Sequence, residues 1–479
     1  MFLLYSLGFL ALYTGVLVYT RCVKKLPEDA DEETARNHKQ MICNRRQVST
    51  MLLLAVMVIE IICNLINFGL QFEGTSVSNY PRGTTYTASV IRYMKEREAR
   101  KSLFFRAETT HSQTLNDGAL NGYNGVSAFT SSANVKVTEF MQTLGYGAKN
   151  TYNRYCHEEA SPVSNLFLNL KYAIERQGKD KTSAYFEEIN RYGNTVLLEN
   201  KAYLPLGFLA ESELGQMEFD VSGVFVVQNR LFSSATGIDA DVWRKVAGQN
   251  LTITGNGTNV TDSSSSGYCA YKDSENGANV VYTYAIDQDG FMCVHLNLPK
   301  RNGVVIRVNG FEIYSETTSL PQMMAVGDVQ VGDEVEVVMS CKENESGTMT
   351  LSAGILNMDR FWRGYEKLKA CPLELTVFSN TRVEGTIDCD RDGLLYTSIP
   401  QNGNWSAFVD GKPAEIRLVG DAMVAVELDQ GTHTVEFRYE NPAFSLGWKI
   451  SLGALVVFGL LVLLMYKPAF RIRRGKYER

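Results

Sequence analysis

Three long runs of apolar residues interrupt an otherwise mixed pattern, at positions 2–19, 51–70 and 446–466. A helix rises ~1.5 Å per residue, so about twenty residues cross a hydrocarbon core of roughly 30 Å. We therefore predict three transmembrane helices, over residues 1–20, 49–71 and 445–466.

Basic residues beside these runs predict the orientation, because Lys and Arg in short flanking segments resist translocation. They gather in two segments, a predicted loop at 21–48 and the tail at 467–479 (Arg21, Lys24, Lys25, Arg36, Lys39, Arg45 and Arg46; Lys467, Arg471, Arg473, Arg474, Lys476 and Arg479). We place both in the cytoplasm. The expected product is a multi-pass protein of the cell membrane with its N-terminus outside, its C-terminus inside and the long middle region extracytoplasmic.

The first part of that middle region, residues 72–248, alternates helical and strand patterns and predicts an α/β domain. Helical signals cover 89–100 and 135–144, and 164–176 begins as a helix and ends as a strand. From about 223 we expect a strand or turn and then two short helices, with Asp239 or Asp241 as a helix cap.

From residue 249 the pattern changes to short alternating runs separated by Gly, Asn, Asp and Ser about every ten residues. This spacing is typical of antiparallel sandwiches. An amphipathic helix at 358–369 interrupts the runs. We predict two β-sandwich modules, 249–370 with a terminal helix and 371–444.

The two modules also look alike. Asn309-Gly310 is echoed about one hundred residues later by Asp410-Gly411, and both dipeptides predict type I′ hairpin turns. Either the modules are related or two similar folds have converged. The expected fold class is α+β: three transmembrane helices plus a large extracytoplasmic region with an α/β subdomain and two antiparallel β-sandwich modules.

Composition narrows the possible partners. The chain is 45% hydrophobic and 21% charged, and its mean hydropathy of −0.14 is too low for a protein made mostly of spans. The net charge is −6 and the basic residues concentrate at the cytoplasmic edges of the predicted spans, so we expect a membrane but no nucleic acid among the partners.

One predicted span carries polar residues. Glu60, Asn64 and Asn67 are spaced at i, i+4 and i+7, which places them on one helical face. An ionisable group at membrane depth costs a few kcal/mol, so this face should meet protein or water. Packing against other helices or a second copy is the first interpretation, and a proton or substrate path is the second.

Familiar catalytic motifs are missing from the sequence. It contains no HExxH, Walker A, GxGxxG or GxSxG pattern, and its five histidines are scattered. We therefore predict no metal site, see no evident cofactor and leave the catalytic residues unknown. Asp239-Ala240-Asp241 is similar to a metal-binding DxD motif, but helix capping is the favoured reading.

Six of the nine cysteines fall in the predicted extracytoplasmic region. They form no regular framework. Cys371 could pair with Cys389, or Cys293 with Cys341, or all four could remain free buried thiols.

Several motifs carry a family resemblance. The stretch GLLYTSIPQNGNWSAFVDGKPAEIR at 393–417, followed by AMVAVELDQGTHTVEFRY and an apolar run, resembles the C-terminal part of YfhO-type bacterial membrane proteins. Matches elsewhere are Asn116-Asp117 with GYNG at 122–125, NLFLNLKY at 165–172, and Gln228-Asn229 with Thr236-Gly237. Together they cover about residues 80–460.

That family resembles the GT-C glycosyltransferases, many-span enzymes that take a sugar from a polyprenyl-phosphate donor and decorate wall polymers such as lipoteichoic acid. The resemblance implies a lipid-linked sugar donor and a cell-wall glycan as ligands. Those enzymes carry a catalytic carboxylate in the first outside loop and many more spans. Here no outside loop precedes Phe72, so we expect a C-terminal part that is not catalytic alone, with a many-span partner subunit or a missing N-terminal half.

The resemblance also suggests site residues, since the family's outside α/β region covers a membrane-level active site. Candidates for lining it are Arg106, Asn116, Asp117, Tyr123 and Lys171. Each has a structural alternative as a turn former, a packing group or a surface group. The alternative function is a non-enzymatic, membrane-anchored protein that binds or assembles wall glycan, and whether the chain is an enzyme stays open at this point.

Overall fold

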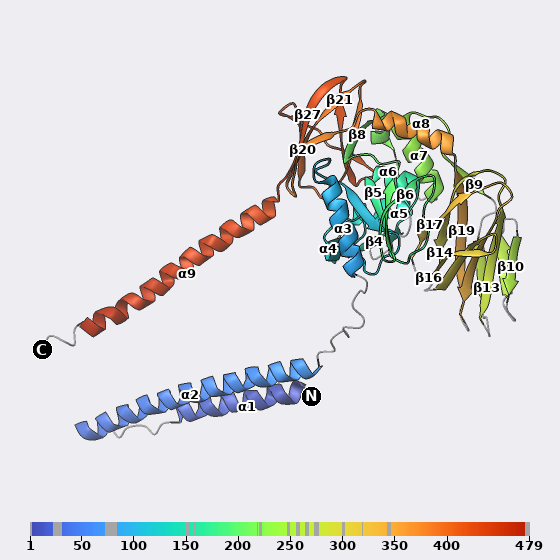
Figure 1. Ribbon diagram of the computed structural model, residues 1–479. Helices are drawn as coiled ribbons and strands as arrows, with labels where there is room; N and C mark the ends of the chain where they lie inside the picture. Colours follow the sequence, from blue (N-terminus) through green and yellow to red (C-terminus); the bar gives the residue numbers. More distant parts are fainter. Residues whose placement is uncertain are drawn as a thin grey trace. The chain divides into compact units, whose positions relative to one another are not determined.

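The computed structural model describes residues 2–22, 31–71, 84–148, 153–157, 160–217, 219, 223–246, 250–254, 259–263, 268–272, 277–298, 302–318, 320–342 and 346–474 (Figure 1). The chain divides into two compact units, Met1–Tyr80 and Pro81–Arg479. It is a mixed α/β protein with several antiparallel sheets.

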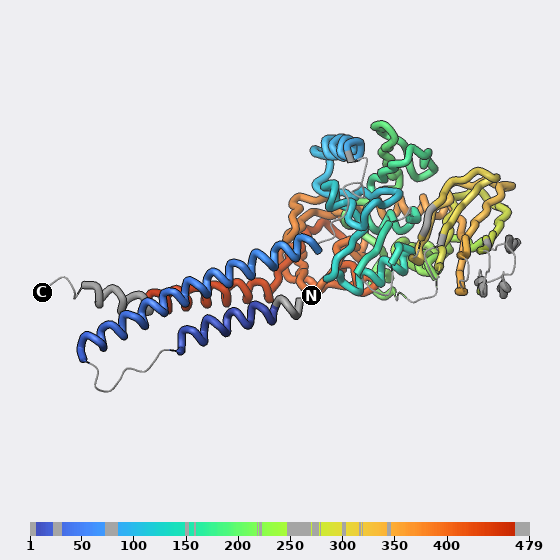
Figure 2. Tube along the Cα trace, turned by 90° about the horizontal axis from the view of Figure 1, so that it is seen from below, coloured from blue at the N-terminus to red at the C-terminus, as the bar shows by residue number. Residues whose placement is uncertain are grey.

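The first unit is a helical hairpin. Helices α1 (Phe2–Arg21) and α2 (Glu32–Gln71) pack side by side (Figure 2). Because α2 begins at Glu32, the predicted loop 21–48 is helical from that residue onward. Near the connected end of the hairpin, Arg45 donates from Nη1 to the Cys22 carbonyl at 2.8 Å.

Two helices in the described part are long and apolar enough to cross a membrane. They are Glu32–Gln71, with a mean hydropathy of 2.3, and Pro442–Leu464, with 2.1. The second belongs to helix α9 (Pro442–Arg474). The predicted first span forms helix α1 but is not one of these two, so a third crossing and the orientation of the chain stay predictions.

The second unit begins with helix α3 (Thr84–Glu98) on a mixed sheet ordered β1-β5-β7-β6. Strands β1 and β5 run parallel, and the other neighbours antiparallel. Val90, Ile91 and Met94, at helical spacing, pack on Tyr172 and Leu197 of the sheet. The strands are β1 (Arg106–Thr109), β5 (Leu170–Glu175), β6 (Phe186–Tyr192) and β7 (Thr195–Asn200).

A small second sheet and several short helices complete this region. The sheet is ordered β2-β4-β3. Its strands and the helices around it are β2 (Ala128–Phe129), β3 (Gly147–Ala148), β4 (Arg154–Cys156), α4 (Asp117–Asn121), α5 (Val135–Thr143), α6 (Pro162–Phe167) and the 3₁₀ helix η2 (Ser212–Gln216).

The prediction for the segment after residue 223 is wrong. A single helix, α7 (Val224–Thr236), is followed by strand β9 (Trp243–Val246), so Asp239 and Asp241 precede a strand and cap no helix. The β-branched run at the start of α7 reads as a strand. Tertiary contacts prevail: Asn229 of α7 accepts from the Trp243 amide at 2.7 Å and donates to the Trp243 carbonyl at 3.0 Å.

The first sandwich packs two antiparallel sheets, ordered β10-β13-β18-β15-β16 and β11-β12-β19-β14-β17, with β9 added beside β19. Their inner faces share one apolar core. The strands are β10 (Asn250–Thr254), β11 (Asn259–Ser263), β12 (Tyr268–Lys272), β13 (Ala278–Ala285), β14 (Gly290–Asn297), β15 (Asn302–Val308), β16 (Phe311–Thr318), β17 (Gln322–Val329), β18 (Glu334–Cys341) and β19 (Gly347–Leu356).

Helix α8 (Met358–Lys369), with the predicted bounds, leads to the second sandwich. Its sheets are ordered β20-β21-β27-β23-β24 and β25-β26-β22-β8 around a separate core. The strands are β8 (Gly207–Ala210), β20 (Glu374–Phe378), β21 (Arg382–Cys389), β22 (Gly393–Pro400), β23 (Trp405–Val409), β24 (Lys412–Ala414), β25 (Arg417–Val419), β26 (Met423–Leu428) and β27 (Gly431–Tyr439).

Strand pairing crosses the predicted segment boundaries. Strands β8 and β9 lie in the 72–248 segment of the chain but pair with β22 of the second sandwich and β19 of the first. The boundaries 72–248, 249–370 and 371–444 therefore stay a prediction about sequence segments, since each sandwich borrows a strand from the α/β region.

The two sandwiches repeat one strand order. The path β13-β18-β15-β16 in the first has the same connectivity as β21-β27-β23-β24 in the second. Both predicted hairpin turns are confirmed: Asn309 and Gly310 have φ of 51° and 81°, and Asp410 and Gly411 have 51° and 75°. Two positive φ values in a two-residue loop define the type I′ turn.

Candidate functional site

Arg106, the first predicted site residue, lies inside the second unit. Its Nη1 donates to the Leu168 carbonyl at 2.9 Å and to Asn169 Oδ1 at 3.2 Å, and its Nη2 donates to the Ser398 carbonyl at 3.1 Å. Burial lowers the pKa of Arg106. The guanidinium thus joins β1, the turn before β5 and strand β22, which indicates a structural anchor.

Asp117 and Asn116 order the loop before α4. Asp117 is 1% exposed; its Oδ2 accepts from Arg176 Nη2 at 2.8 Å, and its Oδ1 accepts from the Thr114 amide at 3.1 Å. Asn116 exchanges two hydrogen bonds with the backbone of Phe129. Both side chains therefore support the turn-forming alternative.

Tyr123 donates to a buried carboxylate that the sequence did not single out. Its hydroxyl lies 3.1 Å from Glu108 Oε1, and Glu108 Oε2 accepts from the amides of Val126 and Ser127 at 2.9 and 2.7 Å. Burial, then the charge of Glu108, raises the pKa of Tyr123. This carboxylate holds the 123–127 loop against β1.

Lys171 belongs to a separate group. Its Nζ lies 2.7 Å from Glu98 Oε2, and the Tyr172 hydroxyl donates to Glu98 Oε1 at 2.7 Å. Lys171 also lines a surface groove of about 480 Å³ with Tyr203, Tyr365 and other residues. The structure thus brings Tyr123 and Asp117 near one another, through Glu108 and Arg176, and places Arg106 and Lys171 elsewhere.

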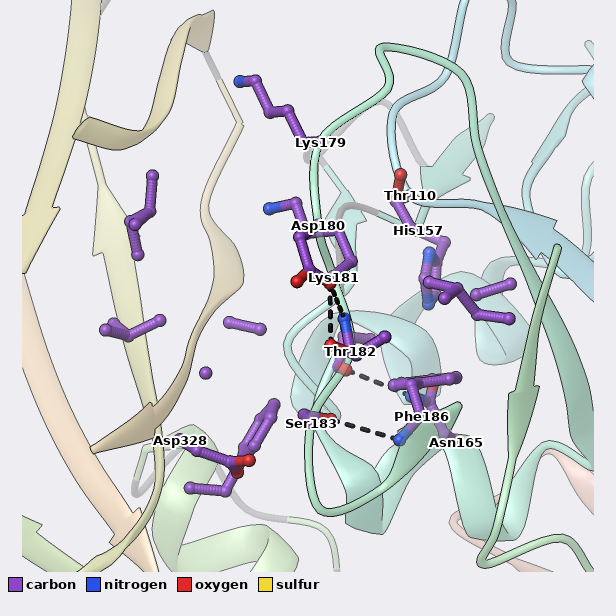
Figure 3. A pocket seen from close by; sticks show the side chains of 18 of the residues that line it. Thr110, His157, Asn165, Lys179, Asp180, Lys181, Thr182, Ser183, Phe186 and Asp328 are labelled. Carbon is purple, nitrogen blue, oxygen red and sulfur yellow. Dashed lines mark hydrogen bonds between the residues drawn. The ribbon is translucent and has the colours of Figure 1, made fainter. Parts of the chain in front are cut away.

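A cavity that the sequence did not predict lies between the α/β sheet and the first sandwich (Figure 3). Its volume is about 460 Å³. One wall comes from β5, β7 and the loop before β6, and the opposite wall from β14, β16 and β17. Its lining residues include Thr110, His157, Asn165, Ala173, Asp180, Thr182, Ser183, Phe186, Leu198, Phe291, Glu312, Ala325 and Asp328.

Hydrogen bonds order the loop of residues 179–183 along the cavity. Asp180 Oδ1 accepts from the Thr182 amide at 2.9 Å and from its hydroxyl at 2.7 Å, and these bonds lower the pKa of Asp180. The Ala184 amide donates to Asp328 Oδ2 at 2.7 Å. This last bond links the loop to the first sandwich, and in Figure 3 the loop runs between Asp328 and the pair His157 and Asn165.

The wall on the α/β side carries buried polar groups. His157 is 2% exposed, and its Nδ1 lies 3.3 Å from the Thr109 carbonyl. Asn165 is 1% exposed and donates from Nδ2 to the Ala160 carbonyl at 3.2 Å. Within the described part of the chain, Asn165 Oδ1 is buried and has no hydrogen-bond partner. A buried acceptor is costly when unsatisfied, so this oxygen suits a ligand or water donor.

Aromatic and aliphatic groups supply the rest of the lining. Phe186 and Phe291 come from opposite walls, with Ala173, Leu198 and Ala325 between the polar groups. A concave site that mixes apolar surface with a few hydrogen-bonding groups is typical of small-ligand sites between packed layers. Sequence reasoning missed it because the walls are about 150 residues apart; Asn165, within the NLFLNLKY motif, was the available signal.

The polar face of α2 meets a partner inside the hairpin. The Tyr13 hydroxyl of α1 donates to Glu60 Oε2 at 2.7 Å. Asn64, about one turn along from Glu60, is exposed, and Asn67, about two turns along, accepts at Oδ1 from Gln71 Nε2 at 3.1 Å. Helix–helix contact thus accounts for Glu60. In the described residues, no group of three or more His, Cys, Asp or Glu side chains could hold a metal ion.

Comparison with solved structures gives only partial matches. A family two carbohydrate esterase from Clostridium thermocellum in complex with cellohexaose is 12% identical, with 22% of this chain and 33% of that chain covered and a TM-score of 0.17. An exo-beta-1,3-galactanase from Phanerochaete chrysosporium is 14% identical, with 25% and 33% covered and a TM-score of 0.17. This chain spans about a third of the length of either, and such scores support no conclusion about a shared fold.

Sequence comparison is more informative. A search of the curated proteins finds no match to this chain. The family model described as bacterial membrane protein YfhO matches residues 1–451, nearly the whole length. The chain therefore belongs to the YfhO family of bacterial membrane proteins.

Proposed function

We propose that the chain is a membrane-anchored glycan-binding protein whose second unit holds the glycan part of a cell-wall polymer, such as lipoteichoic acid, for a lipid-linked-sugar glycosyltransferase. The cavity between the α/β sheet and the first sandwich carries this proposal. It supplies hydroxyl, amide and carboxylate groups beside two phenyl rings. A sugar needs that combination, since its hydroxyls form hydrogen bonds and its ring face packs on apolar surface.

Individual contacts support a neutral, hydroxyl-rich ligand. Asn165 Oδ1 would accept from a sugar hydroxyl, which satisfies a buried acceptor. Asp180, in the loop before β6, and Asp328, on the opposite wall, each already accept from an amide and would accept from further hydroxyls. Phe186 or Phe291 would cover a ring face.

Catalysis by the chain alone is not part of this proposal. The predicted site residues Arg106, Asp117 and Tyr123 take part in internal hydrogen bonds and lie outside the cavity lining. We propose that sugar transfer occurs on a many-span partner or an N-terminal half that carries the catalytic loop. The outward placement of the second unit and the third membrane crossing belong to the same proposal.

A titration tests the ligand class. The full-length protein in detergent micelles is titrated calorimetrically with delipidated lipoteichoic acid, and separately with the unsubstituted polyglycerol-phosphate backbone. Saturable heat with the glycosylated polymer and none with the bare backbone is expected. Equal binding of both would show that the protein recognises the phosphate backbone, and no binding of either would reject the proposal.

A further inference from the structure

Two buried cysteines lie in the core cluster of the second sandwich. The β20–β21 ladder pairs Glu374 with Thr386 and Leu375 with Gly385. Cys371 lies three residues before Glu374, Cys389 lies three residues after Thr386, and both are free thiols in this structure. Both side chains are 3% exposed and belong to the same core cluster.

Contacts to the next residue support this placement. The backbone and side chain of Asp390, the neighbour of Cys389, both hydrogen-bond the Cys371 thiol. Burial, and then the nearby Cys371 thiol, raise the pKa of Cys389 to about 11. The two sulfur atoms are therefore within electrostatic reach of each other.

The other pairing that the sequence left open is different. Cys293 and Cys341 are both buried, but Cys293 packs in the central cluster with Met323 and Phe291, whereas Cys341 packs inside the first sandwich. Side chains alternate between the faces of a strand, and Cys293 points away from the sandwich core that its neighbours Met292 and Val294 fill. These two thiols serve as matched buried controls.

We propose that Cys371 and Cys389 form a disulfide in the mature protein. The inference rests on the outward placement in the proposed function, because disulfides persist in oxidising compartments. The oxidant is a disulfide of an extracytoplasmic thiol–disulfide oxidoreductase. One cysteine thiolate attacks that disulfide and releases one thiol; the second cysteine attacks the mixed disulfide and releases the other. Two electrons and two protons pass to the oxidant, and one S–S bond forms in the chain.

The bond would join more than one hairpin. The Cys371 carbonyl accepts from the Leu209 amide of β8 at 3.0 Å, and the neighbouring Pro372 pairs with Phe208. Strand β8 comes from the α/β region. A Cys371–Cys389 bond would thus hold β8, the strand from the α/β region that pairs with β22, in the second sandwich.

Differential alkylation tests the proposal. The full-length chain is isolated from membranes without reductant, denatured, alkylated, then reduced and alkylated with a second reagent. Peptide mass spectrometry is expected to find Cys371 and Cys389 modified only after reduction, and a linked peptide pair before it. Cys293 and Cys341 should react in the first step. First-step modification of both Cys371 and Cys389 would overturn the proposal.

Variants separate the bond from general effects of the thiols. C371S should leave Cys389 reactive without reductant, and C389S should do the same for Cys371. Reduction should lower the Tm of the wild type and of C293S/C341S by several degrees, but should not change that of C371S/C389S. A reduction shift that persists in C371S/C389S would contradict the proposal. Free thiols in a protein that still binds glycan would reject the disulfide alone, and a disulfide without glycan binding would reject the proposed function alone.

Discussion

His433 Nδ1 lies 2.9 Å from Asp410 Oδ2, across the hairpin turn of the second sandwich. At the same corner of the first sandwich, Asn309 Nδ2 donates to Asp333 Oδ1 at 2.8 Å. The backbone bonds match as well: Asn309 N to Glu334 O and Asp410 N to Thr434 O are both 2.8 Å. The two modules thus share one corner geometry, which favours related modules over convergence. The acidic residue is the turn residue Asp410 in the second module, whereas in the first it is Asp333, the partner of the turn residue Asn309.

This difference predicts a pH effect in one module only. The Asp410 hydrogen bond raises the pKa of His433 above its ordinary 6.5, and the same bond lowers that of Asp410 below 3.8. The contribution of His433 to the free energy of unfolding is therefore fully present below pH 6.5, and it is lost as pH rises through the raised pKa of His433. The contribution of Asp410 to the free energy of unfolding is present above pH 3.8, and it is lost as pH falls through the lowered pKa of Asp410. Because Asp410 is half exposed, we expect the His433–Asp410 pair to stabilise the fold by less than about 1 kcal/mol.

Thermal unfolding between pH 5 and 9 measures this effect. The Tm of the wild type should fall slightly toward alkaline pH. This fall should be absent in H433Q and present in D333N. Equal slopes for the wild type and H433Q would show that His433 does not contribute.

The Asp117–Arg176 pair predicts a stability effect. Both side chains are buried, so D117A leaves a guanidinium without its carboxylate and the amides of Gln113 and Thr114 without an acceptor. Breaking such a buried pair costs about 3–5 kcal/mol. We expect a large fall in Tm and rapid proteolysis near residues 111–117, whereas E188A, at an exposed pair, should cost under about 1 kcal/mol. Normal stability with lost glycan binding would instead restore Asp117 as a ligand contact.

Gly364 of α8 allows the close approach of α7. A Cβ at this position would collide with the Phe232 ring and lie 3.0 Å from Thr236 Cγ2. Overpacking of this kind costs about 1–3 kcal/mol. G364A should therefore lower the Tm clearly. G447A in α9, where nothing lies within 4 Å of the new Cβ, is the control and should not. An unchanged Tm for G364A would mean that the two helices separate readily.

Substitution of Asn165 tests separately its effects on glycan affinity and on the free energy of unfolding. N165A removes the buried acceptor that faces the cavity and the bond to the Ala160 carbonyl. We expect about tenfold weaker glycan binding, equivalent to ~1.4 kcal/mol, and a stability loss of about 1 kcal/mol. S379A, at an exposed turn of the second sandwich, should leave binding unchanged. A stability loss with unchanged affinity would assign Asn165 a structural role only.

Local signals predicted much of the fold. The Asn309-Gly310 and Asp410-Gly411 turns need positive φ, which few residue pairs adopt, and the helix 358–369 shows a strong amphipathic pattern and an Asn357 cap. The sequence does not predict helix α7 because its polar and apolar residues do not match its faces: Val226 is exposed, whereas Gln228 and Asn229 are buried. The cavity could not be predicted because Asp180 and Asp328 come to line one cavity only through tertiary packing.

The proposed site residues show the same limit. Lys171 and Tyr123 are polar residues in matching motifs, but their partners, Glu98 and Glu108, come from other elements. Sequence spacing does not reveal such pairs. Polar residues that satisfy buried partners and polar residues that await a ligand look the same in a sequence.

Filling the cavity tests the central claim most directly. Ala325 is a half-buried strand residue of its lining, and Ala414 is a half-buried strand residue of the second sandwich outside it. Calorimetric titration of delipidated lipoteichoic acid into full-length A325F and A414F compares the same substitution at both places. We predict affinity at least about tenfold weaker for A325F and unchanged for A414F, with both proteins folded by their Tm. Wild-type affinity in a folded A325F would contradict the cavity as the glycan site.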